Sequence, residues 1–292
     1  MLGETFVLMA SLCWAVGANL YRSSIRSISP ATLNLIRSTS AALVLLIFVE
    51  LLGKSRYFLI LDLKSTMYLI VASLIGWALG DTLYFAGLRW IGVSRTVPLA
   101  YSYPLFTLPF SVLVLNERLT INIALGSFAI VVAMWLISES IKNDPHPSSE
   151  KSRLGVATSV SAALCWATAV LMLKRITVTF DPIFIAFFKI LVVIPFLTCY
   201  TALSSSGLSE LRSISARELA MALTGGAVAV GLGDMIYFIG LSLTQANIVA
   251  PLSALTPMFA SLIAMLFSRE RPNVKTIIGV FLVVMGTVLL TQ

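Results

Sequence analysis

Four ionisable residues stand inside long apolar runs of this 292-residue chain, namely Arg37, Asp81, Lys189 and Asp234. A charge at the centre of a lipid bilayer costs about 2.5–3.5 kcal/mol or more, so such residues usually pair with one another. With a rise of about 1.5 Å per residue, Arg37 and Asp81 lie at one depth, about 9–10 Å from the same boundary. Lys189 and Asp234 lie at a matching depth from the opposite boundary. The sequence therefore predicts two ion pairs, Arg37–Asp81 and Lys189–Asp234.

These pairs allow a structural interpretation and a functional one. Each pair could neutralise its own charges and hold two helices together. It could instead line a vestibule, bind a zwitterionic or anionic solute, or open and close as access changes. Asp81 or Asp234 could also take up a proton if its partner leaves. The four residues are candidates for charge pairing or for coupling.

Prolines in the middle of two apolar runs indicate a further polar region; they are Pro98, Pro104, Pro251 and Pro257. A proline leaves a backbone carbonyl without its helical donor, which lipid tolerates only where protein or a wet cavity satisfies that carbonyl. A kink that serves packing is the alternative. The matched places of Pro104 and Pro257 near the midplane favour a solute site. Nearby side chains that could contact a solute are Tyr101, Ser102, Tyr103, Ser253 and Thr256.

Two tryptophans, Trp14 and Trp166, also lie near the middle of apolar runs. A mid-membrane tryptophan is not part of the aromatic belt at the headgroups, and its indole N–H needs a partner. The two tryptophans could line a central cavity or simply pack in the core, and both interpretations remain open. Asn19 adds a polar group close to Trp14. Tyr84 and Tyr237 follow the two aspartates by three residues, on nearly the same helix face, and complete the candidate solute-binding set.

The composition is that of a protein dissolved in lipid. Hydrophobic residues make up 58% of the chain and charged residues 11%, whereas soluble domains carry about 25% charged residues. A water-soluble protein this poor in charge would expose large apolar patches. The net charge is +7, but the basic residues are scattered between apolar runs, as expected of membrane anchors. We therefore expect the lipid bilayer as a partner and no nucleic acid.

The positions of the histidine and cysteine residues do not indicate a metal site or a catalytic site. The three cysteines, Cys13, Cys165 and Cys199, lie inside apolar runs and resemble small buried hydrophobic residues. The only histidine, His146, lies in a polar stretch. We expect no cofactor, no metal and no enzymatic activity.

The elements that position these residues are membrane-spanning helices. A helix needs roughly 20 apolar residues to cross a bilayer, and the chain has room for ten. The polar linker 140–152 divides them into a first repeat, residues 1–139, and a second repeat, residues 153–292. The expected helices lie at roughly 5–21, 31–52, 66–88, 93–115, 120–138, 154–173, 183–203, 218–241, 246–268 and 274–291.

The two halves repeat in sequence. Gly80-Asp81 aligns with Gly233-Asp234, and Cys13-Trp14 aligns with Cys165-Trp166. After five helices the chain is on the other side of the membrane, so the second half runs inverted. Inverted repeats give a transporter two similar conformations, one open to each side. The predicted fold class is an all-α integral membrane protein with ten transmembrane helices as two inverted five-helix repeats.

Each half carries a set of short motifs at matching places. The first half carries Ala86-Gly87-Leu88-Arg89, Pro104, Asn116-Glu117-Arg118-Leu119-Thr120 and Gly126. The second carries Ile239-Gly240-Leu241-Ser242, Pro257, Arg269-Glu270-Arg271-Pro272 and Gly279. These motifs resemble the signature of the EamA family of the drug/metabolite transporter superfamily. This resemblance implies one EamA unit in each half, and export or uptake of metabolites such as amino acids or drugs. From the residues alone, Glu117-Arg118 and Glu270-Arg271 are interpreted as boundary anchors and local ion pairs, not as solute ligands.

Two features depart from the resemblance. Short multidrug members of the superfamily keep a carboxylate in the first helix for proton coupling, whereas Trp14 and Trp166 stand in the comparable places. The family usually has both termini in the cytoplasm. However, Lys and Arg are more numerous in the odd-numbered loops, which places the N-terminus outside by the positive-inside rule. The sidedness stays open.

The function we expect is secondary transport of a small polar metabolite, an amino acid, a related metabolite or a drug-like solute, by alternating access. The protein would be a multi-pass protein of the plasma membrane, with a small-molecule solute as partner and a homodimer possible. A membrane-embedded enzyme acting on lipids is an alternative, but it needs a convergent set of polar catalytic groups. A non-transporting scaffold is another, but it needs no intramembrane charges at matched depths.

Overall fold

The computed structural model describes residues 1–21, 28–139, 149–204, 210, 213–268 and 274–292, and it shows an all-helical membrane protein. Ten helical segments in this part are long and apolar enough to cross a membrane, which confirms the expected number. They run over Leu2–Tyr21, Pro30–Leu51, Leu63–Ile91, Val93–Leu115, Ile121–Ser138, Glu150–Ile176, Pro182–Leu203, Ala216–Leu243, Ala246–Leu266 and Val274–Thr291.

Six of these segments are single helices, and a short helix joins the second segment to the third. The single helices are α1 (Leu2–Tyr21), α3 (Pro30–Leu51), α8 (Ile121–Glu139), α9 (Ser149–Ile176), α10 (Pro182–Leu203) and α16 (Val274–Thr291), and the short helix is η1 (Lys54–Ile60).

The third and eighth segments each contain a π-helical stretch. In the third, α4 (Leu63–Ser73) leads through the π-helix η2 (Leu74–Gly80) into α5 (Asp81–Ile91). In the eighth, α12 (Ala216–Gly226) leads through the π-helix η3 (Ala227–Gly233) into α13 (Asp234–Leu243). Both π-helices end directly before an intramembrane aspartate. These stretches were not predicted from the sequence, and π-helical turns occur frequently at functional sites.

The fourth and ninth segments are broken near their middle. The fourth consists of α6 (Val93–Ala100) and α7 (Pro104–Leu115), and the ninth of α14 (Ala246–Ser253) and α15 (Thr256–Ser268). Pro98 lies inside α6 and Pro251 inside α14. Pro104 and Pro257 lie in the first turns of α7 and α15, where a missing backbone N–H is tolerated. The prolines therefore coincide with real interruptions of both helices.

Helix starts follow from local sequence. The side chain of Ser29 accepts from the backbone N–H of Thr32 at the start of α3, and Asp181 caps α10 in the same manner through Ile183. A proline follows each cap, a position that its fixed φ suits. These two helices occupy matching places in the two repeats, so the caps begin them at equivalent points.

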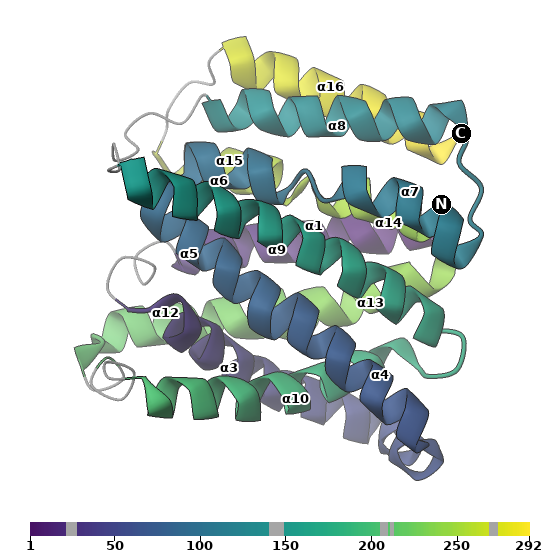
Figure 1. Ribbon diagram of the computed structural model, residues 1–292, viewed down its shortest axis with the longest axis vertical. Coiled ribbons are helices and arrows are strands. Elements are labelled where there is room, and N and C mark those ends of the chain that lie inside the picture. The colour runs from purple at the N-terminus through teal and green to yellow at the C-terminus, as the bar shows by residue number, and fades with distance from the viewer. Residues whose placement is uncertain (22–27, 140–148, 205–209, 211–212, 269–273) are drawn as a thin grey trace.

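The two repeats are interleaved and not merely placed side by side. Helix α1 packs against η3 and α13 of the second half, while α9 packs against η2 and α5 of the first. Figure 1 shows α8 with α16 along one side and α3 with α10 along the opposite side, and these helices also pack in pairs. The chain ends lie near the same end of the molecule (Figure 1). The arrangement is that of two inverted five-helix repeats.

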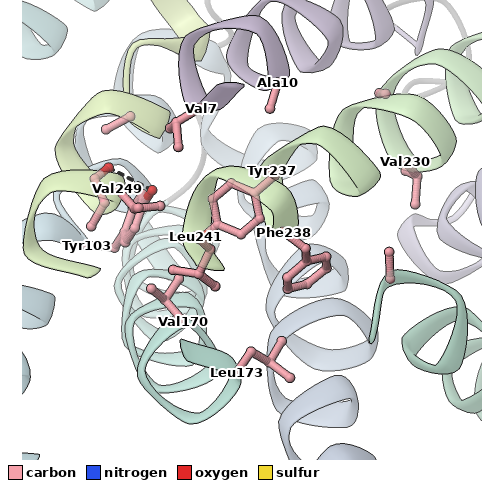
Figure 2. Packing of buried hydrophobic residues seen from close by; sticks show 14 of the residues in the cluster. Val7, Ala10, Tyr103, Val170, Leu173, Val230, Tyr237, Phe238, Leu241 and Val249 are labelled. Carbon is pink, nitrogen blue, oxygen red and sulfur yellow. Dashed lines mark hydrogen bonds between the residues drawn. The ribbon is translucent and has the colours of Figure 1, made fainter. Parts of the chain in front are cut away.

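Much of the core between the repeats is apolar. Figure 2 shows Tyr237, Phe238 and Leu241 of α13 together with Val7 of α1 and Val170 of α9, all members of one buried cluster. Many large apolar side chains on other helix faces are exposed, including Leu113, Phe128 and Phe281. Such exposure is unfavourable in water and favourable against lipid tails.

Candidate functional site

Both predicted ion pairs are present inside the bundle. The guanidinium of Arg37 on α3 contacts Asp81 Oδ2, and the ammonium of Lys189 on α10 contacts Asp234 Oδ2. The side chains of the first pair are 10% and 12% exposed, and those of the second 0% and 2%. Removing one partner of such a pair leaves a buried charge uncompensated, which typically costs about 3–5 kcal/mol. The pairing was therefore correctly predicted from depth.

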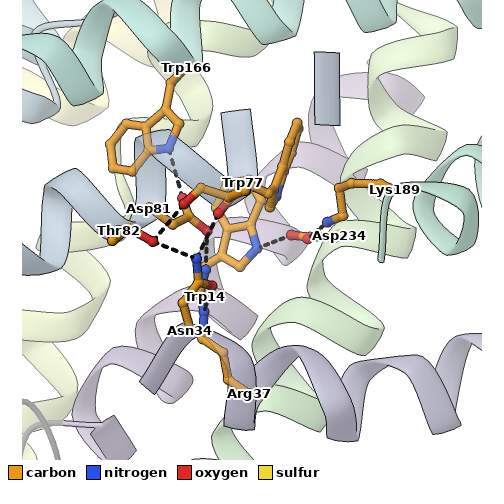
Figure 3. A network of polar contacts seen from close by, with 10 residues as sticks. Trp14, Asn34, Arg37, Trp77, Asp81, Thr82, Trp166, Lys189 and Asp234 are labelled. Carbon is orange, nitrogen blue, oxygen red and sulfur yellow. Dashed lines mark hydrogen bonds and ion pairs between the residues drawn. The ribbon is translucent and has the colours of Figure 1, made fainter. Parts of the chain in front are cut away.

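Each aspartate also binds a tryptophan from the opposite repeat. Trp166 on α9 donates its indole N–H to Asp81 Oδ1 at 2.8 Å, and Trp14 on α1 donates to Asp234 Oδ1 at 2.7 Å. Figure 3 shows these contacts converging in one polar network. Each carboxylate thus joins a cation of its own repeat to an indole of the other. From the sequence, the tryptophans were expected either to line a cavity or to pack in the core. Their aspartate partners were not predicted.

The glycine before each aspartate makes room for the tryptophan. A Cβ at Gly80 would lie 3.1 Å from Trp166 Cδ1, and a Cβ at Gly233 would lie 3.0 Å from Trp14 Cδ1. Both distances are tighter than most real Cβ contacts. Small residues of this kind let membrane helices approach closely, so the Gly-Asp dipeptide positions the acceptor and leaves room for its donor.

The cations of the two pairs have different surroundings. Arg37 also donates from Nε to Asn34 Oδ1 at 3.0 Å, and its guanidinium carbon lies 4.8 Å from the ring centroid of Phe85. Lys189 Nζ lies 4.4 Å from the ring centroid of Trp77 and 5.6 Å from that of Phe238. These distances place both cations within range of cation–π attraction.

Asn34 was not among the candidates. Its side-chain amide donates to the carbonyl oxygen of Trp77 at 2.7 Å and to Thr82 Oγ1 at 3.2 Å. It thereby connects α3 to the third segment beside Asp81 (Figure 3). The available signal was its position three residues before Arg37 in the same apolar run, because residues so spaced lie on one helix face.

The two broken helices meet through their candidate residues. The hydroxyl of Tyr103 donates to the carbonyl oxygen of Ala250 at 2.8 Å and also contacts the Ser253 hydroxyl. Thr256 Oγ1 donates to the carbonyl oxygen of Ser253 at 2.8 Å. Ser11 on α1, which the sequence analysis missed, donates to the carbonyl oxygen of Leu252 at 3.2 Å. The interruption of the ninth segment is therefore satisfied by protein groups from α1 and the fourth segment.

Aromatic candidates gather around Trp166. Its ring centroid lies 5.2 Å from that of Tyr84, 5.6 Å from that of Tyr101 and 6.0 Å from that of Tyr103. In the matching place of the other repeat, Trp14 packs on Tyr237 with centroids 5.0 Å apart. Rings at these separations attract each other. We call Tyr84, Tyr101, Tyr103 and Trp166 the aromatic cluster.

Two further candidates, Ser102 and Asn19, donate to backbone carbonyls of the described residues. Ser102 Oγ donates to the carbonyl oxygen of Leu99 at 2.7 Å, within the break of the fourth segment. Asn19 Nδ2 donates to the carbonyl oxygens of Ala15 at 2.9 Å and Ala260 at 3.1 Å, which ties α1 to α15. Neither joins the network around the aspartates. In the described part of the chain, no group of three or more His, Cys, Asp or Glu side chains gathers at one place.

Comparison with known proteins identifies the family of this chain. The model of the EamA-like transporter family matches residues 1–139 and 153–292. The chain belongs to the EamA-like transporter family. A relative from Archaeoglobus fulgidus, called an uncharacterized transporter, is 25% identical over 292 residues, with 99% of this chain and 98% of the relative covered. A crystal structure at 19% identity has a TM-score of 0.82 and covers 98% of this chain and 95% of its own, which shows a shared fold.

One EamA motif residue has a role that differs from the one expected from the sequence. Glu117 was interpreted as a boundary anchor in a local ion pair. Instead its two carboxylate oxygens accept from the backbone N–H groups of Ala246 at 2.6 Å and Asn247 at 3.0 Å, while Asn247 Nδ2 donates to the carbonyl oxygen of Arg118 at 3.0 Å. A carboxylate is favourable at a helix N-terminus, so Glu117 caps α14 of the other repeat. The matching Glu270-Arg271 lies outside the described residues.

Proposed function

We propose that this EamA-family protein is a secondary transporter that moves a small polar metabolite across the plasma membrane by alternating access. The solute would be an amino acid, a related metabolite or a drug-like molecule. Membership of a transporter family and the multi-pass helical fold support the general role. The solute class and the mechanism are our proposal, and they follow from the arrangement of the aspartates and the aromatic cluster.

The observation that carries the proposal is the exchange of contacts between repeats. Trp14 of the first repeat binds Asp234 of the second, and Trp166 of the second binds Asp81 of the first. A movement of one repeat against the other must change these buried contacts. Because the repeats are inverted, weakening these contacts on one side of the membrane or on the other gives two related conformations. This is the structural basis of alternating access.

The aromatic cluster is the proposed solute contact. Tyr84, Tyr101 and Trp166 are only partly buried, although they lie inside the bundle beside Asp81. Their rings pack directly on one another in this structure, so binding would separate them. Aromatic rings with hydroxyl and indole groups suit a solute that has both apolar and polar parts. The charged pairs next to them suit an ammonium or carboxylate group.

The surroundings of the protein complete the proposal. The lipid bilayer is the proposed solvent of the exposed apolar side chains, and the plasma membrane is the proposed location. A small-molecule solute is the proposed partner, with no nucleic acid. The transport activity needs only one copy, since both repeats lie in a single chain.

A ligand screen tests this proposal. Detergent-purified protein is heated with amino acids, nucleotide sugars, organic acids and cationic drugs, and each hit is then tested for uptake into proteoliposomes. A ligand at about 100 times its dissociation constant stabilises a protein by about 2.7 kcal/mol. Asp81→Asn and Tyr101→Ala should lose both the shift and the uptake. Tyr200→Ala, whose native side chain is 56% exposed, is the control and should keep both.

Two results would contradict the proposal. One is a ligand whose stabilisation and uptake are the same in Tyr101→Ala and in the native protein, because the solute would then bind elsewhere. The other is the absence of both stabilisation and uptake for every solute class in the screen. Either result would leave the fold and the ion pairs as described.

A further inference from the structure

The two repeats contain two charge centres with the same design and different cations. We define the Arg37 centre as Arg37, Asp81 and Trp166, and the Lys189 centre as Lys189, Asp234 and Trp14. In each centre the aspartate binds a cation through Oδ2 and an indole N–H through Oδ1. Arginine remains protonated in proteins, whereas a buried lysine can release its proton. Equal geometry therefore supports different proton chemistry at the two centres.

The neighbours of each cation increase this difference. Arg37 has a second oxygen acceptor, Asn34, on the preceding turn. Ala186 stands at the matching position of the second repeat and has no polar side chain. Among the described contacts, the ammonium of Lys189 has one hydrogen-bond acceptor, Asp234, although an ammonium carries three N–H donors. Its side chain is 0% exposed, so the protonated form of Lys189 depends almost entirely on one carboxylate.

The ionised form of Asp234 depends less on Lys189 than the protonated form of Lys189 depends on Asp234. Asp234 accepts from the indole of Trp14 at 2.7 Å, and this hydrogen bond persists whether or not Lys189 carries its third proton. When the proton leaves, the Nζ–H bond breaks, its electron pair stays on nitrogen, and the proton passes to water. The pair changes from zero net charge to one negative charge. The neutral amine can still donate an N–H to Asp234.

Other titratable groups near the centre do not supply the same change. Arg37 and Asp81 act on the pair electrostatically, and they neutralise each other. Cysteine and tyrosine near the pair are neutral at pH 7 in their ordinary state. Lys54 of η1 is bound to Asp181 at the start of α10 at 2.6 Å. The other titratable groups on the elements packed against α10 are Glu50 of α3, Arg56 and Tyr57 of η1, Lys64 and Tyr68 of α4 and Tyr237 of α13. Cys13 and Tyr21 of α1 interact electrostatically with Asp234.

We propose that Lys189 is the proton-exchange site that couples transport to a proton gradient, and that the Arg37 centre is its permanently charged counterpart. This inference rests on the proposed transport function. Lys189 is closed off from solvent in this structure, so its proton exchanges only when the helices around α10 and α13 separate. A proton bound on one side and released on the other links the gradient to the change of conformation.

The test uses intrinsic tryptophan fluorescence and requires no solute. Purified protein in detergent is titrated from about pH 5 to about pH 10, because buried lysines release their protons as low as about pH 5–6 and solvated ones near 10.4. The Trp77 ring lies 4.4 Å from Lys189 Nζ, so loss of the charge changes its emission. The native protein should show a one-proton transition. Lys189→Arg should remove it, and the control Lys64→Arg, at an exposed position of α4, should retain it.

A second pair of variants covers the case in which Lys189→Arg does not fold. Trp77→Phe and Trp14→Phe each keep the lysine and remove one indole of its surroundings, so each should lower the amplitude. Trp135→Phe, on α8, should keep it. The proposal is overturned by a flat native titration, by an unchanged transition in Lys189→Arg, or by full amplitude in both Trp77→Phe and Trp14→Phe. Failure here would leave solute transport standing, and a failed uptake assay would not affect the titration.

Discussion

Trp14 and Asp234 are 220 residues apart in sequence, yet the indole N–H of the first lies 2.7 Å from a carboxylate oxygen of the second. This contact joins the first helix of one repeat to the eighth membrane segment, which belongs to the other repeat. The same contact occurs between Trp166 and Asp81. The two repeats are therefore held together by their most costly buried groups, and a conformational change between them has to act on these groups.

Replacing Trp14 by Phe should destabilise the protein. The substitution keeps an aromatic ring but removes a donor to a buried charged acceptor, which typically costs about 1.5–3 kcal/mol. Thermal unfolding in detergent, followed by light scattering or by a thiol dye, measures the effect. Trp135→Phe is the control because the native side chain is 49% exposed on α8. Equal unfolding temperatures for the two variants would show that the Trp14 hydrogen bond adds no stability.

Neutralising both members of the Arg37–Asp81 pair should cost less than neutralising one. Asp81→Asn alone leaves a buried guanidinium uncompensated, at about 3–5 kcal/mol. The double variant Arg37→Gln with Asp81→Asn removes that charge, so a double-mutant cycle should show strong coupling. A charge swap is a poorer test, because Trp166 would then direct its N–H at a cation. Purely additive losses in unfolding temperature would contradict the pairing.

Glu117→Gln should weaken the start of α14. The amide keeps one acceptor oxygen but turns an NH₂ group toward one of the two backbone donors that the carboxylate now binds. Loss of a helix cap costs about 0.5–2 kcal/mol, and the loss should appear as a lower unfolding temperature. Glu150→Gln, at an exposed position near the start of α9, is the control. A result in which both variants unfold alike would remove the capping role.

Tyr103→Phe should destabilise the protein modestly. The change removes a donor to the Ala250 carbonyl at the break of the ninth segment. A hydrogen bond of this kind is worth about 0.5–1.5 kcal/mol, so the unfolding temperature should fall. Thermal unfolding in detergent measures the effect, with Tyr200→Phe as the control. An unchanged unfolding temperature in Tyr103→Phe would show that this hydrogen bond adds no stability.

The sequence by itself determined the membrane fold and the two ion pairs. Span number follows from the length of apolar runs, and the inverted arrangement follows from an odd number of spans in each repeat. The partners of Arg37 and Lys189 could be predicted because depth along a helix is linear in residue number. A buried charge then has few possible partners at its own level.

Only the tertiary structure decided which groups of one repeat meet those of the other. The bonds from Trp14 to Asp234 and from Glu117 to the start of α14 depend on how α1 and the fourth segment pack against distant helices. The π-helices before Asp81 and Asp234 were likewise not predicted from the sequence and became visible only in the structure. Hydropathy and depth place a residue along the membrane normal. The rotation of each helix about its axis, and the helices that lie beside it, are set by close packing of side chains across the whole bundle.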